Sequence, residues 1–141
     1  MILQIVFLLL AVVLQHFPGK ANTLLSETSE MQKKEIVDKH NAIRRQVQPT
    51  ASNMMKMMWN EKAAMNARRW AGKCQAISSP REERMVDGSL CGEITLQTNY
   101  PTSWHDAIDA FSSGKTFFQY STGSTDPTKN VYGYTQVGRE T

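Results

Sequence analysis

The residues from Ile2 to Leu14 form a run that is apolar at every position but one, and the chain has no second long run of this kind. About a dozen apolar residues are fewer than the roughly 20 that a membrane-spanning helix needs. The run lies at the extreme N-terminus and is followed by polar and helix-breaking residues, as in a secretory signal peptide. We therefore predict a signal peptide at 1–21, cleaved near Gly19 or Ala21, and a secreted, extracellular product without a transmembrane segment.

The rest of the chain is long enough for one folded domain and too short for two. The full chain has 141 residues, of which 40% are hydrophobic and 21% charged, and this is an ordinary globular composition. Its 16 Lys and Arg against 13 Asp and Glu are scattered along the sequence and leave a net charge of +3. Because there is no polybasic tract, we predict no nucleic acid or membrane surface as a partner.

Three segments have the apolar spacing of amphipathic helices, in which side chains three and four positions apart share a face. The predicted helices cover 31–47, 61–74 and 104–111. A capping box of Ser29 and Gln32 marks the start of the first helix, and Pro49 marks its end. The second helix places Cys74 on the face that is turned toward the core.

Two segments alternate as strands do. These are Cys91–Leu96 and Val131–Val137, the second of which is the last strand candidate of the chain. Met54–Trp59 is apolar but short, and we interpret it as a buried connector or a short strand. The polar stretches Ser78–Gly88 and Tyr120–Lys129 are predicted to be surface loops.

Four pieces of the sequence, in order, resemble one known family. They are 35–45 (EIVDKHNAIRR), 49–59 (PTASNMMKMMW), 91–93 (CGE) and 134–137 (YTQV), and 66–71 (NARRWA) adds to the match. The chain resembles the CAP (SCP) domain of the cysteine-rich secretory proteins, a family that includes sperm-associated and venom proteins. The resemblance implies an α+β fold built as a three-layer α-β-α sandwich, secretion, and no established enzymatic activity.

The resemblance also implies a cleft in which two histidines and two glutamates hold a divalent metal, often zinc. His40 and Glu93 fall on two of these positions. The second histidine is replaced by Gly133, and the second glutamate is expected where this chain has Ser113, Gly114 and Lys115. A stable zinc site needs three or four protein ligands. His40 and Glu93 are therefore an incomplete metal site, and we predict no cofactor, or only weak binding of a divalent metal such as zinc.

In the family, further strands and a cysteine-dense module associated with ion-channel regulation follow the last matched piece. This chain has instead a short tail, so we expect an incomplete sheet in a truncated product that lacks the channel-acting module. The predicted organisation is a signal peptide at 1–21, an N-terminal extension at 22–34, a partial CAP domain at 35–137 and a divergent tail at 138–141.

Cys74 and Cys91 are the disulfide candidates. The resemblance places their usual partners in the missing C-terminal part, so within this chain they can bond only to each other. Such a bond would contribute roughly 3 kcal/mol if its geometry were relaxed, but the sequence does not show that the two residues come within bridging distance. Two free thiols or pairing between molecules are equally open.

The resulting functional prediction is a secreted, non-enzymatic binding module with an extracellular or sperm-surface protein as its partner. Its association with reproduction comes from the resemblance alone. We predict no catalytic residue, because none of the serines lies in a nucleophile signature and half of the metal cleft is missing.

Three alternatives stay open. The first is a lipid or sterol carrier, for which the methionines of 54–58 would offer an adaptable surface if they are not core residues. The second is a metal-assisted hydrolase built on His40 and Glu93. The third is a non-functional truncated product, because an incomplete sheet would leave apolar surface exposed.

Overall fold

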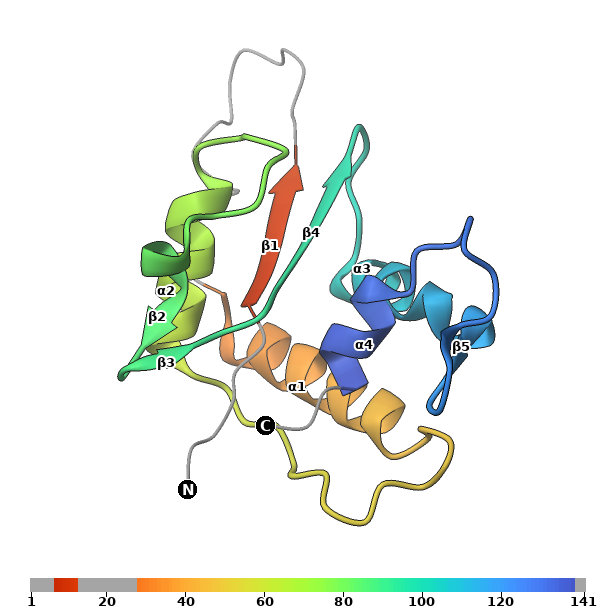
Figure 1. Ribbon diagram of the computed structural model, residues 1–141. Coiled ribbons are helices and arrows are strands. Elements are labelled where there is room, and N and C mark those ends of the chain that lie inside the picture. The colour runs from red at the N-terminus through yellow and green to blue at the C-terminus, as the bar shows by residue number, and fades with distance from the viewer. Residues whose placement is uncertain (1–6, 13–27, 139–141) are drawn as a thin grey trace.

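The computed structural model describes residues 7–12 and 28–138, and helices lie on both sides of its longest strand pair (Figure 1). The helices are α1 (Glu30–Arg44), α2 (Glu61–Ala71), α3 (Trp104–Ser112) and α4 (Tyr132–Gly138), with short 3-10 helices η1 (Arg81–Arg84) and η2 (Ser113–Phe117). The strands are β1 (Phe7–Val12), β2 (Met85–Val86), β3 (Ser89–Leu90), β4 (Glu93–Thr98), β5 (Phe118–Gln119) and β6 (Gly123–Ser124). The predicted α+β class is confirmed.

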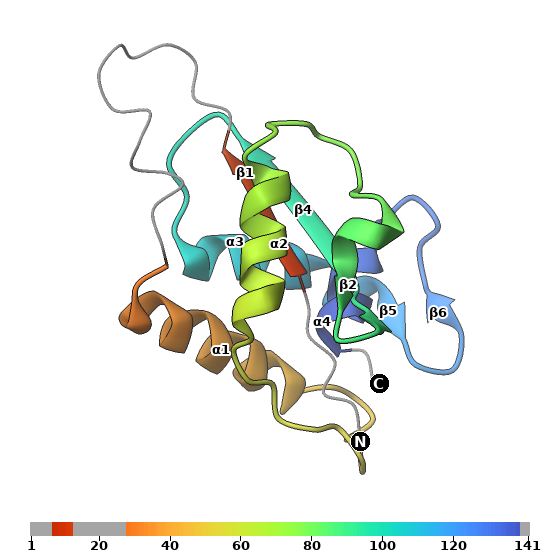
Figure 2. The same ribbon diagram turned by 90° about the vertical axis from the view of Figure 1, so that its left-hand side faces the viewer.

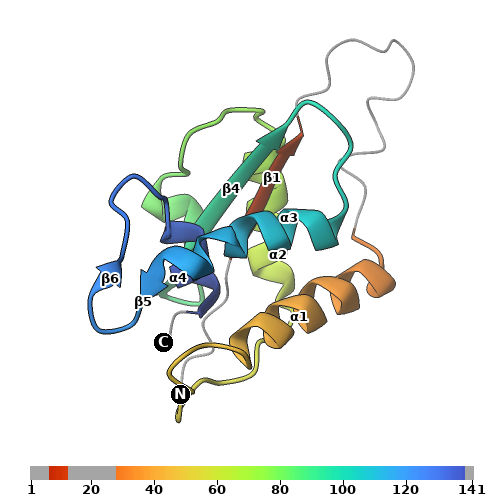
Figure 3. The ribbon, with the colours of Figure 1, turned by 90° about the vertical axis from the view of Figure 1, so that its right-hand side faces the viewer.

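The strands of the described ranges form three separate pairs, and only the pair of β1 and β4 is longer than two residues. These two strands run parallel over their full lengths, from Phe7 opposite Glu93 to Val12 opposite Thr98. Helix α2 packs against β1, while α3 and α4 contact β4, and α1 packs on α3 and α4 (Figures 2 and 3). This arrangement is consistent with a three-layer fold whose sheet is incomplete.

Two groups of buried side chains fill the space on the two sides of this pair. The α1 cluster consists of Ile36, Ile94, Ile108, Phe111 and Val137. The α2 cluster consists of Ala63, Ala67, Trp70, Val86 and Cys91. None of the helices in the described ranges is long and apolar enough to cross a membrane.

The predicted helix starts are confirmed by their caps. Ser29 and Gln32 form the capping box of α1, with each side chain accepting a hydrogen bond from the other residue's backbone N–H. The side chain of Asn60 accepts a hydrogen bond from the N–H of Ala63 at the start of α2. Because capping depends on side chains within one turn, these starts can be predicted from local sequence.

The end of α2 corrects one prediction. The helix ends at Ala71 with Gly72 as its C-cap, and Cys74 follows with a φ of 52° in the left-handed region. Cys74 is exposed, so the prediction that it faces the core is wrong. The apolar pattern in the sequence therefore extends to Cys74, although the helix itself ends at Ala71.

The last predicted strand is also wrong, because 131–137 contains helix α4 rather than a strand. The side chain of Asn130 accepts a hydrogen bond from the N–H of Tyr132, which gives this helix a polar start. Tyr134 and Val137 are buried and lie three residues apart, which places them on one helical face. Packing against α3 thus overrides the alternating pattern of the sequence.

The predicted loop at 78–88 contains η1 and strand β2, so this prediction is wrong in part. Strands β2 and β3 form an antiparallel hairpin across Asp87 and Gly88, whose φ values are 49° and 81°. Two positive φ values in a two-residue turn match the twist of a hairpin, and Asp-Gly is a sequence that favours them. The predicted loop at 120–129 likewise includes β6, which pairs with β5.

Strand β1 lies inside the predicted signal peptide at 1–21. Its residues pair with β4, whereas the predicted cleavage sites at Gly19 and Ala21 lie outside the described residues. The signal peptide therefore stays a prediction. The position of β1 in the fold nevertheless gives this segment a structural role that the sequence pattern did not indicate.

Candidate functional site

His40 lies in the middle of α1 and is completely buried. Its Nδ1 atom is 2.7 Å from the carbonyl oxygen of Ile36, one helical turn earlier. Because a carbonyl can only accept, Nδ1 must carry the hydrogen, which leaves Nε2 as the atom with the free lone pair in the neutral ring. Nε2 is buried and has no hydrogen-bond partner in the described part of the chain.

The surroundings of His40 keep its ring neutral. Burial lowers the pKa of His40 from its ordinary value of 6.5. The hydrogen bond to the Ile36 carbonyl opposes part of this shift, and the positive charge of Arg44 adds a smaller lowering. A buried imidazole loses the hydration that stabilises its charged form, and a nearby cation adds repulsion. His40 is therefore an uncharged acceptor at neutral pH.

Glu93 begins strand β4 and is also buried. Its carboxylate accepts two hydrogen bonds from the backbone N–H of Ser79, at 2.9 and 3.1 Å, and another from the Ser79 hydroxyl. Ser79 lies in the stretch that was predicted to be a surface loop, but it is buried. This pairing cannot be predicted from local sequence, because the two residues are 14 positions apart.

The structure places both predicted metal ligands in the interior but does not link them. His40 and Glu93 both lie within the described residues, and no hydrogen bond or ion pair joins them. His40 is bonded within α1, and Glu93 is bonded to the segment before η1. Each side chain thus serves a local structural contact.

Backbone packing closes Gly133 and Gly114, two of the positions where the resemblance expects further ligands. A Cβ atom at Gly133 would overlap the carbonyl oxygen of Phe111. A Cβ atom at Gly114 would lie 2.7 Å from the carbonyl oxygen of Asn130 and 2.8 Å from the Cα atom of Val131. Within residues 7–12 and 28–138, no three His, Cys, Asp or Glu side chains gather where they could hold a metal. The residues present therefore do not fit a zinc ion.

Two polar residues of α1 that the sequence analysis passed over hold three segments together. Asn41 donates from Nδ2 to the carbonyl oxygen of Met57 at 3.0 Å and accepts from the N–H of Met57 at 2.8 Å. Arg44 donates to the carbonyl oxygens of Val137 at 2.9 Å and Met55 at 2.8 Å. We call Asn41 and Arg44 the α1 clamp. It fixes the connector and the end of α4 on the C-terminal half of α1.

The α1 clamp explains the structure of the methionine-rich segment. Met54–Trp59 has no regular secondary structure, so it is a connector and not a short strand. Met54, Met55 and Met57 are half-buried, while Met58 is 58% exposed. The methionines are therefore neither all core residues nor all part of an exposed, adaptable surface.

The two cysteines have different environments. Cys91 is buried in the α2 cluster, Cys74 is exposed after α2, and no disulfide joins the two in the structure. A disulfide formed during secretion between these candidates, or pairing between molecules, stays a prediction.

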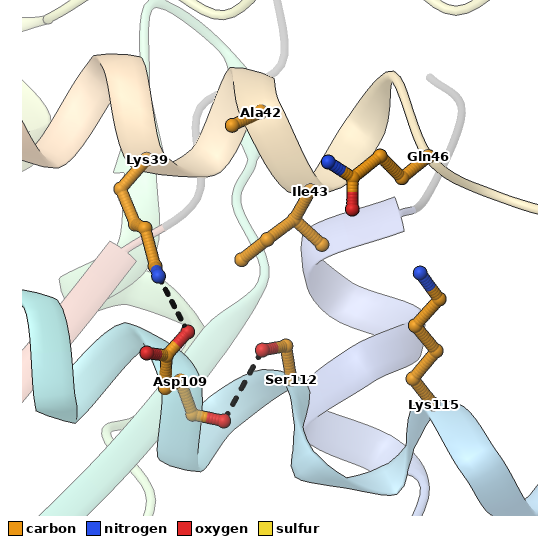
Figure 4. A pocket seen from close by; sticks show the side chains of 7 residues that line it. All are labelled: Lys39, Ala42, Ile43, Gln46, Asp109, Ser112 and Lys115. Carbon is orange, nitrogen blue, oxygen red and sulfur yellow. Dashed lines mark hydrogen bonds and ion pairs between the residues drawn. The ribbon is translucent and has the colours of Figure 1, made fainter.

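A small open pocket lies between α1 and the α3–η2 segment (Figure 4). Its volume is about 230 Å³, and the side chains around it include Lys39, Ile43, Asp109, Ser112 and Lys115. The Nζ atom of Lys39 is 2.6 Å from a carboxylate oxygen of Asp109 and 2.8 Å from Nε2 of His105. Lys39, Asp109 and Lys115 thus bring charged groups to this pocket, while Ala42 and Ile43 bring apolar ones.

Residues 37–138 match the family described as CAP, the cysteine-rich secretory protein family. The chain is similar to cysteine-rich secretory protein 3 of Equus caballus, with 41% identity over 140 aligned residues that include 96% of this chain. The alignment covers 57% of that relative, so the chain spans little more than half of its length.

Proposed function

Because the chain belongs to the CAP family of cysteine-rich secretory proteins, we propose that it is a secreted, non-enzymatic binding module. We propose an extracellular or sperm-surface protein as its partner, in the reproductive tract. The observation that carries this proposal is the local use of both candidate site residues. The neutral ring of His40 is bonded to Ile36, and the carboxylate of Glu93 is bonded to Ser79.

These contacts argue against acid-base catalysis. A general base must reach the proton that it removes, directly or through one water molecule. His40 is completely buried, and Glu93 is 4% exposed with three hydrogen bonds from Ser79. Neither side chain is free to take part in a reaction at the surface. The same contacts, with the closed positions at Gly114 and Gly133, support a module that works without a resident metal or other cofactor.

The proposal of secretion rests on the apolar run from Ile2 to Leu14 and on membership in a family that is named for secretory proteins. The proposed role concerns the binding surface of the CAP domain alone.

The test is to express the full chain in mammalian cells with a C-terminal tag and to measure its appearance in the medium. The secreted protein is then added to intact sperm, and bound protein is measured by flow cytometry with and without added zinc. We expect secretion and saturable binding that zinc does not change. His40→Ala serves as the comparison, because a metal-assisted hydrolase would lose activity in this variant.

Two results would contradict the proposal. One is retention of the chain inside the cells, and the other is hydrolytic activity of the secreted chain that depends on zinc and on His40. Sterol or fatty acid that co-purifies with the secreted chain, as measured by mass spectrometry, would favour the lipid carrier instead.

A further inference from the structure

Strand β1 pairs with β4 and contacts helix α2. Its six residues, Phe7–Val12, are uncharged and apolar, and each has a partner in β4. Helix α2 packs against β1 on one side of the strand pair (Figure 2). Among the described residues, β1 is the only strand paired with β4. We call the position that it fills, between β4 and α2, the β1 slot.

The same six residues lie in the middle of the apolar run that we propose as the secretory leader. Cleavage of a leader at about residue 20 would separate β1 from the rest of the chain. The edge of β4 would then present a row of unpaired N–H and C=O groups, which readily pair with another extended chain. Helix α2 would lose the strand against which it packs.

We propose that in the processed protein the β1 slot binds an extended, apolar segment of a partner protein, which pairs with β4 as a parallel strand. This inference rests on the proposed secretion, in which the leader is removed. Strand addition of this kind takes its affinity from main-chain hydrogen bonds and its specificity from side chains on the two faces of the added strand.

The sequence of β1 indicates which segment the slot accepts. Strands of parallel pairs that are covered on both faces have consecutive apolar residues, whereas half-exposed strands alternate. Phe7–Val12 is apolar at all six positions. The partner segment is therefore expected to have about six consecutive apolar residues and no charge, in an extended conformation.

A second copy of this chain does not fit that description once its own leader is removed. Between residues 28 and 138, no other run of six consecutive residues is entirely apolar. The methionine-rich segment comes nearest, but it is interrupted by Lys56 and is held by the α1 clamp. The slot therefore points to a different protein as the source of the strand.

The test uses the full chain expressed through a secretory pathway, and the intact mass of the product shows whether Phe7–Val12 has been removed. A fluorescent peptide with the sequence of Phe7–Val12, flanked by lysines for solubility, is titrated into the secreted protein. The control is the same peptide with Leu9→Pro, which lacks one N–H and resists strand pairing. We expect the matched peptide to bind at least tenfold more tightly.

Hydrogen exchange then locates the bound peptide. The amides of β4, at Glu93–Thr98, are expected to become protected when the matched peptide is added and to stay unprotected with the Leu9→Pro peptide. Processed protein that is recovered only as aggregate is refolded with each peptide, and rescue by the matched peptide alone would support the slot.

Several results would overturn the inference. These are equal binding or equal rescue by the two peptides, an absence of protection in β4, a product that retains Phe7–Val12, and a dimer whose β4 amides are protected without peptide. Failure of the proposed function has a separate readout, because secretion and binding to sperm are measured without the peptide.

Discussion

The two sides of the β1–β4 pair are stabilised in different ways. The α1 cluster combines long side chains from α1, β4, α3 and α4, and the sequence positions of its members span 36 to 137. The α2 cluster combines two alanines with Trp70, Val86 and Cys91, all within residues 63 to 91. The α1 cluster therefore joins distant parts of the chain, whereas the α2 cluster joins elements that are close in sequence.

Other contacts follow the same division. On the α1 side, the α1 clamp joins helix α1 to the connector and to the end of α4. On the α2 side, Arg69 and Lys73 of the α2 end pair with Glu83 of η1, and the Lys73 ammonium lies 4.2 Å from the ring centre of Trp70. Because α2 also packs against β1, removal of Phe7–Val12 would take away a packing surface on this side.

The largest effect is expected from truncation of Phe111 in the α1 cluster. Phe111→Ala removes a buried ring and should lower the free energy of unfolding by about 3–5 kcal/mol. Val86→Ala in the α2 cluster removes two methyl groups and should cost roughly 1–2.5 kcal/mol. Urea unfolding of the full chain measures both.

The control is Tyr120→Ala, at a site that is 73% exposed. Its free energy of unfolding is expected to lie within about 0.5 kcal/mol of the parent value. Equal losses of unfolding free energy for the two core variants would contradict the expected difference between the α1 and α2 clusters.

The next effect tests how closely α4 approaches α3. Gly133→Ala places a Cβ atom against the Phe111 carbonyl and forces the backbone to move, which should cost about 1–3 kcal/mol. Gly138→Ala, near the end of the same helix, is the matched control. A Cβ atom there would meet a methyl group of Val47 at 3.7 Å, an ordinary contact. Thermal unfolding should show a lower Tm for the first variant only, and an unchanged Tm for both would argue against the close contact.

A pH dependence of intermediate size is expected on the α1 side. The pKa of His40 is lowered by burial, so between its folded pKa and about pH 6.5 the unfolded state binds more protons than the folded state. Stability that is complete above pH 6.5 should therefore be lost as the pH falls, by at most about 1.4 kcal/mol per pH unit.

The measurement is urea unfolding at steps between about pH 7.5 and 5, which is above the range where carboxylates titrate. His40→Gln keeps a polar side chain but has no titrating group, so its stability should change less with pH. The same slope in the parent and the variant would show that His40 is not responsible.

The smallest effect is expected at the start of α2. Asn60→Ala removes the side-chain acceptor for the N–H of Ala63 and should cost about 1 kcal/mol. Asn60→Ser keeps an N-cap oxygen and should restore most of the loss. Circular dichroism with urea unfolding checks both variants. A loss that Ser does not restore would indicate that Asn60 acts through another contact.

The sequence was informative where structure depends on neighbouring residues. Ser29 and Asn60 identify helix starts because each side chain bonds to a backbone group within three residues. Helix α4 was missed because it packs against α3 through residues far apart in the sequence, such as Gly133 and Phe111, which are 22 positions apart. Strand β1 was missed because an apolar run of its length is also typical of a signal peptide.

The candidate site was predicted in part. The resemblance identified His40 and Glu93, and both are buried in the structure. Their partners were not predicted, because the Ile36 carbonyl is a main-chain atom and Ser79 lies in a polar stretch that resembles a loop. The α1 clamp was missed because Asn41 and Arg44 are polar residues that a hydrophobic pattern assigns to the surface.

The α1 clamp has a consequence for which substitutions the connector can accept. The hydrogen bonds of Asn41 and Arg44 to the connector described above join main-chain atoms of Met55 and Met57. These hydrogen bonds position the segment without involving its side chains. Other residues of similar size at 55 and 57 would therefore keep them. Substitutions at 55 and 57 are therefore expected to leave the backbone of the connector in place. A substitution of Asn41, in contrast, removes two of the hydrogen bonds that position it.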